Sequence, residues 1–552
     1  MKKTFLLFII VLCSIALFAQ NEDWLWAKQA GGTDYDEGKS IAVDVNGNSY
    51  VTGYFAQSAT FGANILTSIG EVDIFVAKLD RNGNWLWAKQ AVGSGVVHGY
   101  GIAVDANGNS YVTGGFSGSA TFGTTTLTSS SWGDIFVAKL DSNGNWLWAK
   151  QAVGSGFVHG YGIAADANGN SYVIGSFYGS VSFGNIPLLS NVENIFVAKL
   201  NSNGNWLWVK QAGGTIDVLG GSIAVDANGN SYVTGRFSGN VSFGTIPLIS
   251  NVENMFVAKL NSSGNWLWAK QAGCSDCDIC YGNDIAVDAN GNSYVTGFFV
   301  GNANFGTTTL TSSGNYDIFV AKLNSNGNWL WAKQAGGTDI DFGNSIAVNA
   351  NGNSYVTGNF SSRYATFGTT TLNGDMYGRS YIFVAKIDNN GNWFWAKQAG
   401  GTGLDYVKSI AIDTNGNSYV TGWFYDNATF GATTLTGSGD YDIFVAKLGE
   451  GNSISLPDII SFNGIHSIYP NPFNPLTTID YEISMPADVK IEVYNNRGQL
   501  VRSFALGYKE QGSYKLTWEG EDNNGCLCST GIYYIRMQAG KEIYTKKAVL
   551  LK

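Results

Sequence analysis

Acidic side chains recur in the segments that join successive repeats of this chain. They are Asp34, Asp36, Glu37, Asp276, Asp278, Asp339, Asp341 and Asp405. Carboxylates gathered on one face of a protein either form a solvated acidic rim or bind a cation or a cationic partner. The candidate ligand-binding residues among them are Asp34, Asp36, Glu37, Asp339, Asp341 and Asp405.

A second acidic pattern, Asp-x-Asn-Gly-Asn, recurs along the chain, as at Asp105–Asn109. Its oxygens have the spacing of part of a calcium loop, but the glycine at the sixth position and the distal glutamate are missing. Hairpin turns stabilised by the Asp side chain explain the pattern without a metal. We therefore expect no cofactor, and calcium is the one cation left open.

Tryptophans come in pairs two residues apart, as at Trp85 and Trp87. Two such rings on one face of a strand would form a platform on which a sugar ring can stack. The pairs occupy the same position in every repeat, however, which favours packing between repeats. Trp132 lies outside the pattern on a variable loop and is a candidate ligand contact.

Three cysteines, Cys274, Cys277 and Cys280, crowd one segment between repeats. Three thiolates without a nearby histidine make an incomplete metal site. In an oxidising compartment one local disulfide with a leftover thiol is expected. Since the repeats are nearly identical and no histidine is placed as a general base, we expect no catalytic residues.

These residues sit on a repeat of about 60 residues. Its Trp-rich segment begins at Trp24, Trp85, Trp146, Trp206, Trp266, Trp329 and Trp393, and its Ile-Ala-Val segment at Ile41, Ile102, Ile163, Ile223, Ile285, Ile346 and Ile410. Each repeat shows four alternating segments with the period of β-strands, joined in part by Asn-Gly turns. The pattern predicts an all-β, seven-bladed propeller of four-stranded blades, in which Trp24–Gln29 closes the last blade.

In such a meander the Asn-Gly turns lie at one end of the blades. The longer segments, such as Ala56–Asp73 and Gly336–Asn344, lie at the other end, where we expect varied loops. Because recognition commonly uses variable loops on a rigid scaffold, this end is predicted to bind ligand. Replacing Asp339, Asp341 or Trp132 is accordingly predicted to weaken binding without lowering the melting temperature.

Two family resemblances rest on these motifs. Residues 102–114 with Asp134–Leu140 resemble the SBBP-type β-propeller repeat of secreted bacterial proteins. In the tail, Tyr469–Pro475, Ile491–Val501 and Lys546–Lys552 are similar to the type A sorting domain of type IX (Por) secretion. That second resemblance implies a small β-sandwich that the type IX machinery of a Gram-negative outer membrane recognises.

The domain organisation predicted from these features is a signal peptide at 1–19, the propeller at 20–449, a linker at 450–467 and the sorting β-sandwich at 468–552. The leader has two lysines and a short apolar run, typical of a cleaved secretory signal, and no span is expected to cross a membrane after cleavage. A net charge of −10 argues against nucleic acid as a partner.

Three classes of function stay open. The favoured one is a secreted or surface-anchored binding, adhesion or scaffold module with an extracellular glycan or protein as ligand. An extracellular polysaccharide-active hydrolase or lyase, which needs only paired carboxylates, is the second. A purely structural surface component is the third.

Overall fold

The computed structural model describes residues 22–130, 132–274, 279–450, 464–483, 486–510, 512–540 and 542–551. Within these ranges every regular element is a β-strand, and no helix has the length and apolar character needed to cross a membrane. The chain divides into two compact units, one ending at Gly451 and the other beginning at Asn452. The predicted signal peptide, 1–19, lies outside the described residues, as do residues 451–463 of the predicted linker.

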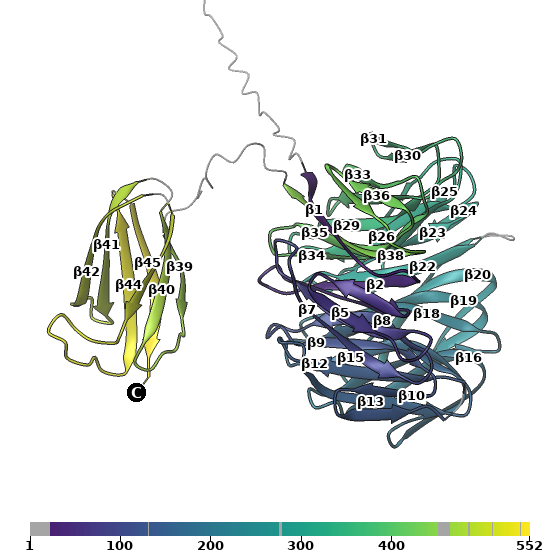
Figure 1. The fold of residues 1–552 in the computed structure, drawn as a ribbon, viewed down its shortest axis with the longest axis horizontal. Coiled ribbons are helices and arrows are strands. Elements are labelled where there is room, and N and C mark those ends of the chain that lie inside the picture. The colour runs from purple at the N-terminus through teal and green to yellow at the C-terminus, as the bar shows by residue number, and fades with distance from the viewer. Residues whose placement is uncertain are drawn as a thin grey trace, which may run out of the picture. The chain divides into compact units, whose positions relative to one another are not determined.

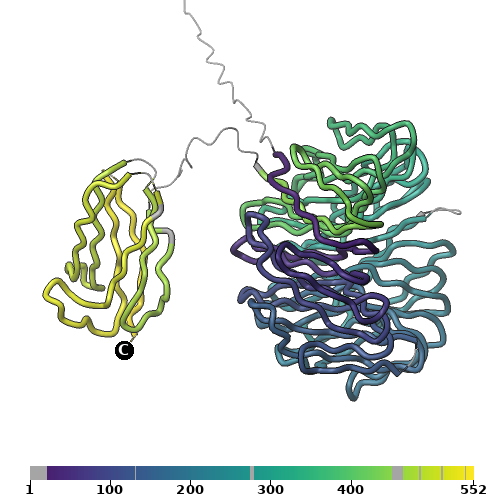
Figure 2. The backbone as a smooth tube through the Cα atoms, viewed as in Figure 1, coloured from purple at the N-terminus to yellow at the C-terminus, as the bar shows by residue number. Residues whose placement is uncertain are grey.

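The first unit is built of antiparallel four-stranded blades (Figures 1 and 2). Blade 1 holds β2 (Asp36–Val43), β3 (Ser49–Phe55), β6 (Asp73–Leu79) and β7 (Trp85–Gly93). Blade 2 holds β8 (Val97–Val104), β9 (Ser110–Phe116), β12 (Asp134–Leu140) and β13 (Trp146–Gly154). Blade 3 holds β14 (Val158–Ala165), β15 (Ser171–Phe183), β16 (Ile186–Leu200) and β17 (Trp206–Gly214). Blade 4 holds β18 (Val218–Val225), β19 (Ser231–Phe243), β20 (Ile246–Leu260) and β21 (Trp266–Cys274).

The remaining blades follow the same plan. Blade 5 holds β22 (Cys280–Val287), β23 (Ser293–Phe299), β26 (Asp317–Leu323) and β27 (Trp329–Ala335). Blade 6 holds β28 (Asp341–Val348), β29 (Ser354–Phe360), β32 (Tyr381–Ile387) and β33 (Trp393–Gly401). Blade 7 holds β34 (Asp405–Ile412), β35 (Ser418–Phe424), β38 (Asp442–Glu450) and, as its outer strand, β1 (Glu22–Ala30).

The blades close into a ring. The inner strands contact one another in a cycle, β2, β8, β14, β18, β22, β28, β34 and back to β2. Strand β1 pairs antiparallel with β38, with Ala30 opposite Ile443, and Figure 1 shows it in purple beside the green strands of blade 7. A closed ring of antiparallel blades is a β-propeller, so the predicted fold class is confirmed.

Short hairpins between the second and third strands of the blades depart from the prediction of varied loops. They are β4 (Ser58–Phe61) with β5 (Asn64–Thr67), β10 (Ser119–Phe122) with β11 (Thr125–Thr128), β24 (Asn302–Phe305) with β25 (Thr308–Thr311), β30 (Tyr364–Phe367) with β31 (Thr370–Asn373), and β36 (Asn427–Phe430) with β37 (Thr433–Thr436). In blades 3 and 4 the extended ends of β15, β16, β19 and β20 form the same hairpin. The hairpins pair with the outer strand of the preceding blade or bridge to the residue after it. They are therefore regular links between blades.

The Asp-x-Asn-Gly-Asn turn is held by its own side chains, as blade 2 shows. Asp105 Oδ1 accepts hydrogen bonds from the backbone N–H groups of Asn107 and Asn109, while Gly108 supplies the positive φ of 77°. Tyr111 donates its hydroxyl to Asp105 Oδ2 at 3.0 Å, and Lys139 lies 4.7 Å over the Tyr111 ring. The motif is a structural turn, and the side-chain oxygens of its aspartate are already used.

The Trp pairs join neighbouring blades. Trp87 packs edge-on against Tyr50 and donates its indole N–H to the carbonyl of Ser142 in blade 2. Trp146 packs edge-on against Phe122 at 5.0 Å and donates to the carbonyl of Gln90 in blade 1. The prediction that these rings pack between blades is confirmed.

The second unit has two sheets. One contains β39 (Gly464–Tyr469), β40 (Thr477–Ile483) and β43 (Gly512–Trp518), and the other contains β42 (Leu500–Lys509), β41 (Ala487–Asn495), β44 (Gly531–Ala539) and β45 (Glu542–Leu550). Buried Ile479 of the first sheet and Ile491 and Ile535 of the second belong to one core, which also includes Trp518. The predicted small β-sandwich is confirmed.

Candidate functional site

The blades differ at one end of the central channel, where the inner strands begin. Two facing positions differ from blade to blade, one on the first strand and one on the second. On the first strand they are Glu37, His98, His159, Leu219, Tyr281, Phe342 and Tyr406, and on the second Tyr54, Gly115, Ser176, Arg236, Phe298, Asn359 and Trp423. We call these residues the channel mouth.

Blades 1 and 2 supply a charged and hydrogen-bonded side of the mouth. Glu37 forms an ion pair with Lys39 at 2.6 Å and accepts the hydroxyl of Tyr54 at 2.7 Å. The His98 ring lies against Tyr54, and its Nδ1 is 2.8 Å from the hydroxyl of Tyr100. Burial, and then the positive charge of Lys39, lower the pKa of His98 to about 4, so this imidazole is neutral at neutral pH.

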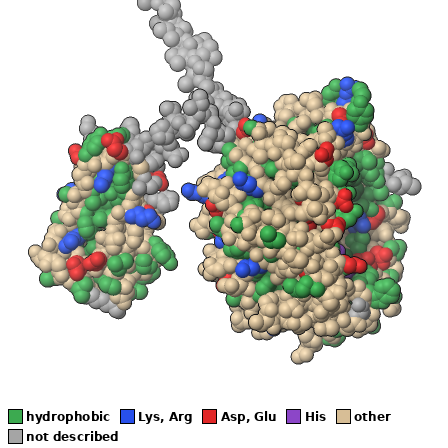
Figure 3. Space-filling model, viewed as in Figure 1, with side chains coloured by type: hydrophobic (Ala, Val, Ile, Leu, Met, Phe, Trp, Pro, Cys, Tyr) green, Lys and Arg blue, Asp and Glu red, His purple; other side chains and the backbone are tan. Residues whose placement is uncertain are grey.

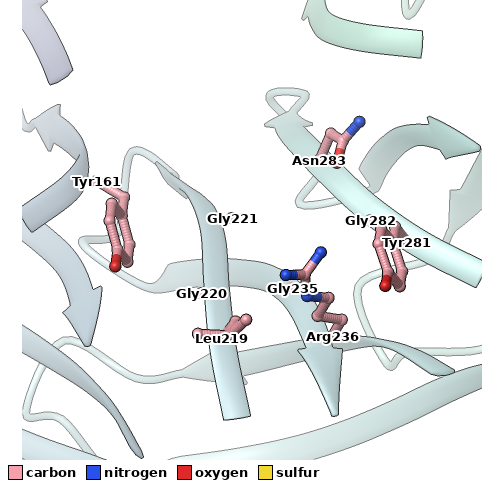
Figure 4. A pocket seen from close by; sticks show the side chains of 9 residues that line it. All are labelled: Tyr161, Leu219, Gly220, Gly221, Gly235, Arg236, Tyr281, Gly282 and Asn283. Atoms are coloured by element: carbon pink, nitrogen blue, oxygen red, sulfur yellow. The ribbon is translucent and has the colours of Figure 1, made fainter. Parts of the chain in front are cut away.

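Blades 3 to 5 enclose a cavity of about 260 Å³, shown in Figure 4. Tyr161 lines one side, and Arg236 and Tyr281 line the other. Arg236 lies 3.1 Å from Glu253 and 4.2 Å from the centre of the Tyr281 ring. The guanidinium is thus held in place by a carboxylate and an aromatic face.

Blades 5 to 7 supply an aromatic side. Phe298 packs against Tyr281 at 4.8 Å and Phe342 at 4.7 Å. Trp423 stacks on Tyr406 at 5.0 Å and approaches Tyr441 at 4.2 Å. In Figure 3, green hydrophobic and red acidic side chains gather on the side of the propeller that carries β16 and β20 in Figure 1. The mouth therefore combines polar groups on some blades with aromatic rings on others.

Below the mouth the channel narrows to a polar cavity of about 150 Å³, which we call the channel waist. Its lining includes Lys39, Lys408, Asn283, Asp284 and Asn344. Serine hydroxyls also line it and tie neighbouring blades together: Ser40, Ser409 and Ser345 accept backbone N–H groups of Ile102, Ile41 and Ile410, respectively. Tyr161, Gly221 and Asn283 line both the waist and the mouth cavity, so the two cavities are adjacent.

The opposite end of the channel is lined by the Ile-Ala-Val segments of all the blades. Only Ala165 and Ile412 depart from the pattern there, and both are apolar. This end offers the same apolar group from every direction, whereas the mouth has the unlike groups that specific recognition needs.

The predicted acidic residues fall into two groups. Asp36, Asp341 and Asp405 are fully buried, so these three do not belong to a solvated acidic rim. Asp341 accepts hydrogen bonds from the backbone N–H groups of Gly337, Ser361 and Ser362 and from the Ser362 hydroxyl. Its replacement by Ala is expected to lower stability, contrary to the sequence-based prediction, because these donors would lose their acceptor.

The other acidic candidates are partly exposed. Asp34 accepts a hydrogen bond from the Gln57 side chain at 2.7 Å, and the backbone N–H of Asp339 donates to the Ser362 hydroxyl. Of the six acidic candidates, Glu37 is the one at the channel mouth. In the described ranges no three His, Cys, Asp or Glu side chains are grouped so as to hold a metal ion.

Trp132 is 89% exposed and remains a solvent-facing aromatic. Cys280 is buried at the start of β22, whereas Cys277 and the side chain of Cys274 lie outside the described residues. The predicted disulfide among these three cysteines is thus still a prediction.

Sequence reasoning missed most of the mouth because it searched the loops. The available signal was substitution inside the repeated strands. The residue after Val-Thr-Gly (Val-Ile-Gly in one repeat) is Tyr54, Gly115, Ser176, Arg236, Phe298, Asn359 or Trp423, although its neighbours hardly change. A position that varies within a nearly invariant strand is therefore the signal that could have identified this candidate site.

Comparisons with known proteins agree with this architecture. Residues 25–54, 86–114, 207–240, 267–297, 330–359 and 395–423 match the SBBP β-propeller repeat, and residues 475–542 match the FlgD Ig-like domain. An uncharacterized WD repeat-containing protein, L264, of Acanthamoeba polyphaga mimivirus is 25% identical over 533 residues; the alignment covers 77% of this chain and 38% of that protein.

Similar solved structures include a fungal alcohol oxidase of the AA5 family, at 12% identity and a TM-score of 0.38, with 96% of this chain and 100% of that one covered. PorZ, a surface component of the type IX secretion system of Porphyromonas gingivalis, has 11% identity and a TM-score of 0.17, with 95% and 100% covered. The matches to the two family models rest on the sequence motifs themselves and are more specific than these structural similarities. The chain carries β-propeller repeats of the SBBP type between residues 25 and 423, followed by an Ig-like domain similar to that of FlgD.

Proposed function

We propose that this chain is an extracellular binding protein that holds a glycan at the channel mouth. The observation that carries the proposal is the gathering of unlike side chains at one end of a ring whose repeats are otherwise nearly identical. A purely structural ring would have no need to vary these facing positions while keeping their neighbours.

The chemistry of the mouth suits a sugar. The partly exposed rings of Phe298 and Tyr406 offer apolar area against which a sugar ring can pack. Arg236 and Glu37 supply hydrogen-bonding groups on other blades, which sugar hydroxyls require as partners. A concave site with many aromatic and a few oriented polar groups is the usual form of a small-molecule site.

Binding is favoured over catalysis by how the carboxylates are used. Glu37 is engaged by Lys39 and Tyr54, and Glu253 by Arg236 and Tyr281. For Glu37, burial is outweighed by the charge of Lys39 and by the hydrogen bonds from Lys39 and Tyr54, which lower its pKa and favour the ionised form over the protonated form a general acid needs. A glycan that is cleaved on the protein would instead support the polysaccharide-active enzyme.

The C-terminal unit is proposed as the export address. Its motifs resemble the type IX sorting domain, and the matching Ig-like model supports an independently folded β-sandwich. This route would place the propeller on the outer surface of a Gram-negative cell or release it, with the type IX machinery as the partner of the tail.

A glycan array with the full-length protein tests the function. We expect Arg236→Ala and Phe298→Ala to abolish or weaken binding by about ten-fold or more, because each removes a mouth contact. The matched controls are Arg81→Ala, at an Asn-Gly turn, and Phe394→Ala, on the outer strand β33, where both side chains are exposed. Equal loss in the controls, or no glycan bound by the protein, would contradict the proposal.

A further inference from the structure

Two lysines from adjacent blades face the channel waist. Lys39 of β2 and Lys408 of β34 occupy equivalent positions, each directly before the serine that precedes the Ile-Ala-Val or Ile-Ala-Ile segment. The other blades have Tyr100, Tyr161, Gly221, Asn283 and Asn344 at this position. Positive charge at the waist is therefore confined to blades 7 and 1.

The two ammonium groups are not equivalent. Lys39 is neutralised by Glu37 at 2.6 Å. Lys408 is half-buried and lies 4.9 Å from the centre of the Tyr406 ring, and among the described residues no carboxylate oxygen lies within 4.0 Å of its Nζ. A partly buried cation that lines a cavity without an anionic partner is poorly compensated.

A second unused donor packs on the same ring. Trp423 is only 9% exposed and stacks on Tyr406. Within the described part of the chain, its buried indole N–H has no hydrogen-bond acceptor. Two polar donors, the Lys408 ammonium and the Trp423 indole N–H, therefore lie beside Tyr406 on the aromatic side of the mouth. Among the described residues, the ammonium has no carboxylate partner and the indole N–H has no hydrogen-bond acceptor.

We propose that Lys408 binds the carboxylate of an acidic sugar residue in the glycan that enters the channel mouth. The proposal rests on the proposed function and narrows its ligand to uronic-acid glycans. The mouth and waist cavities are adjacent at Tyr161, Gly221 and Asn283, and in this proposal the sugar reaches the lysine, which lines the waist, from the mouth. A carboxylate would receive the charge-assisted hydrogen bond that Lys408 lacks.

The other charged groups near this site are accounted for. Glu37 and Lys39 of β2 face Lys408 and form their own pair. Asp284 of β22 lines the same cavity, but its carboxylate accepts hydrogen bonds from the Ser345 hydroxyl and from the backbone N–H groups of Ile285 and Ile346. Among these charged groups, Lys408 is thus the one without a carboxylate partner and the one that an anionic ligand would bind.

The test is calorimetric titration of the full-length protein with oligogalacturonate, oligoglucuronate and oligomannuronate, each compared with its methyl ester. We expect at least one acid to bind about ten-fold or more tightly than its ester, and Lys408→Met to remove that difference. The control Lys333→Met changes a lysine of the outer strand β27 and should have no effect. Melting curves establish that each variant is folded.

The pH dependence provides a separate readout. Burial and the charge of Lys39 lower the pKa of Lys408 to about 8, so affinity for the acid should fall about ten-fold as the pH is raised from 7 to 9. Lys408→Arg should keep its affinity at pH 9, because the guanidinium stays charged.

Three results would overturn the acidic-sugar site. The first is that the acids bind no more tightly than their esters. The second is that Lys408→Met keeps the difference in affinity between acid and ester. The third is that sodium acetate competes at the same concentration as the oligosaccharides. A neutral glycan whose binding depends on Arg236 and not on Lys408 would leave the proposed function standing.

Discussion

At the scale of single residues, the most unusual chemistry outside the channel is a pair of buried carboxylates at the ring closure. Asp36 begins β2 and Asp442 begins β38, and both carboxylates border Gly31. Burial and, secondarily, the negative charge of Asp442 raise the pKa of Asp36 to about 8. Backbone N–H groups of Gly32 and Ala56 donate to Asp36 and moderate this effect.

This shift gives stability a defined pH dependence. Asp36 holds its proton in the folded state between about pH 4 and pH 8, whereas the unfolded chain has lost it. The contribution of this residue to the free energy of unfolding is therefore full below about pH 4 and falls as the pH rises toward 8. Asp405, whose pKa burial raises to about 7, adds to the same trend.

We predict that Asp442→Asn raises the melting temperature at pH 9 and flattens the loss of stability between pH 6 and 9. The chain itself has Asn194 and Asn254 at the equivalent positions of blades 3 and 4, so the amide fits. The gain should be about 1–3 kcal/mol in the free energy of unfolding. In the control Asp134→Asn, the residue that faces position 134 is Val158, so the substitution removes no repulsion between two carboxylates. An equal gain in both variants would show that repulsion within the pair is not the cause.

At the scale of elements, the hairpins carry much of the contact between blades. In blade 2, β10 pairs with the end of β7, with Ala120 opposite Gly93. Phe122 of this hairpin is almost fully buried and lies 4.9 Å from Phe136 and 5.0 Å from Trp146. The hairpin thus packs on the aromatic rings of its own blade as well as pairing with a strand of blade 1.

Phe122→Ala is expected to destabilise the propeller by about 3–5 kcal/mol, because it leaves a cavity among aromatic rings. Thermal or urea unfolding measures the effect. Thr128→Ala on the same hairpin changes an exposed side chain and should leave the melting temperature nearly unchanged. If the Phe122 variant melts like the Thr128 variant, the hairpin does not contribute to the core.

The sequence predicts the strands of the blades because period-two alternation and Asn-Gly turns are local signals. It does not reveal the hairpins, since Ala-Thr-Phe-Gly and Thr-Leu-Thr are short and the outer strand that they pair with lies in another blade. The channel mouth was missed for a related reason. Glu37 of blade 1 and Trp423 of blade 7 meet around one axis only when the ring has closed.

Closure of the ring is a further property of elements. Strand β1 brings Trp26 against Tyr419, and Glu22 lies 3.9 Å from Lys386 of blade 6. In blade 6 the usual turn aspartate is replaced by Asn349, so the carboxylate near this lysine comes from β1. The strand therefore completes blade 7 and also contacts its neighbour.

Deleting residues 22–30 should lower the melting temperature strongly and promote aggregation, because it exposes the edge of β38 and removes these contacts. A synthetic peptide of residues 22–30 added in excess should restore part of the lost stability by binding the folded state. A deletion variant that melts like the full-length protein would refute the role of β1 in closure.

At the scale of the whole molecule, the chain consists of two units with separate cores. The propeller ends with β38, and the C-terminal unit has its own core around Trp518. Since neither core uses residues of the other, the proposed binding and the proposed export can be tested independently.

Removing residues 464–552 should leave the melting temperature and glycan binding of the propeller nearly unchanged, because the lost residues form a separate unit. In a host with a type IX system, the truncated protein should accumulate in the periplasm while the full-length protein reaches the surface or the medium. The converse fusion is the control: residues 464–552 attached to a periplasmic reporter should carry the reporter outside. If the truncated protein is exported normally, or the fused reporter stays behind, the C-terminal unit is not an export address, and its β-sandwich must serve the propeller in another way.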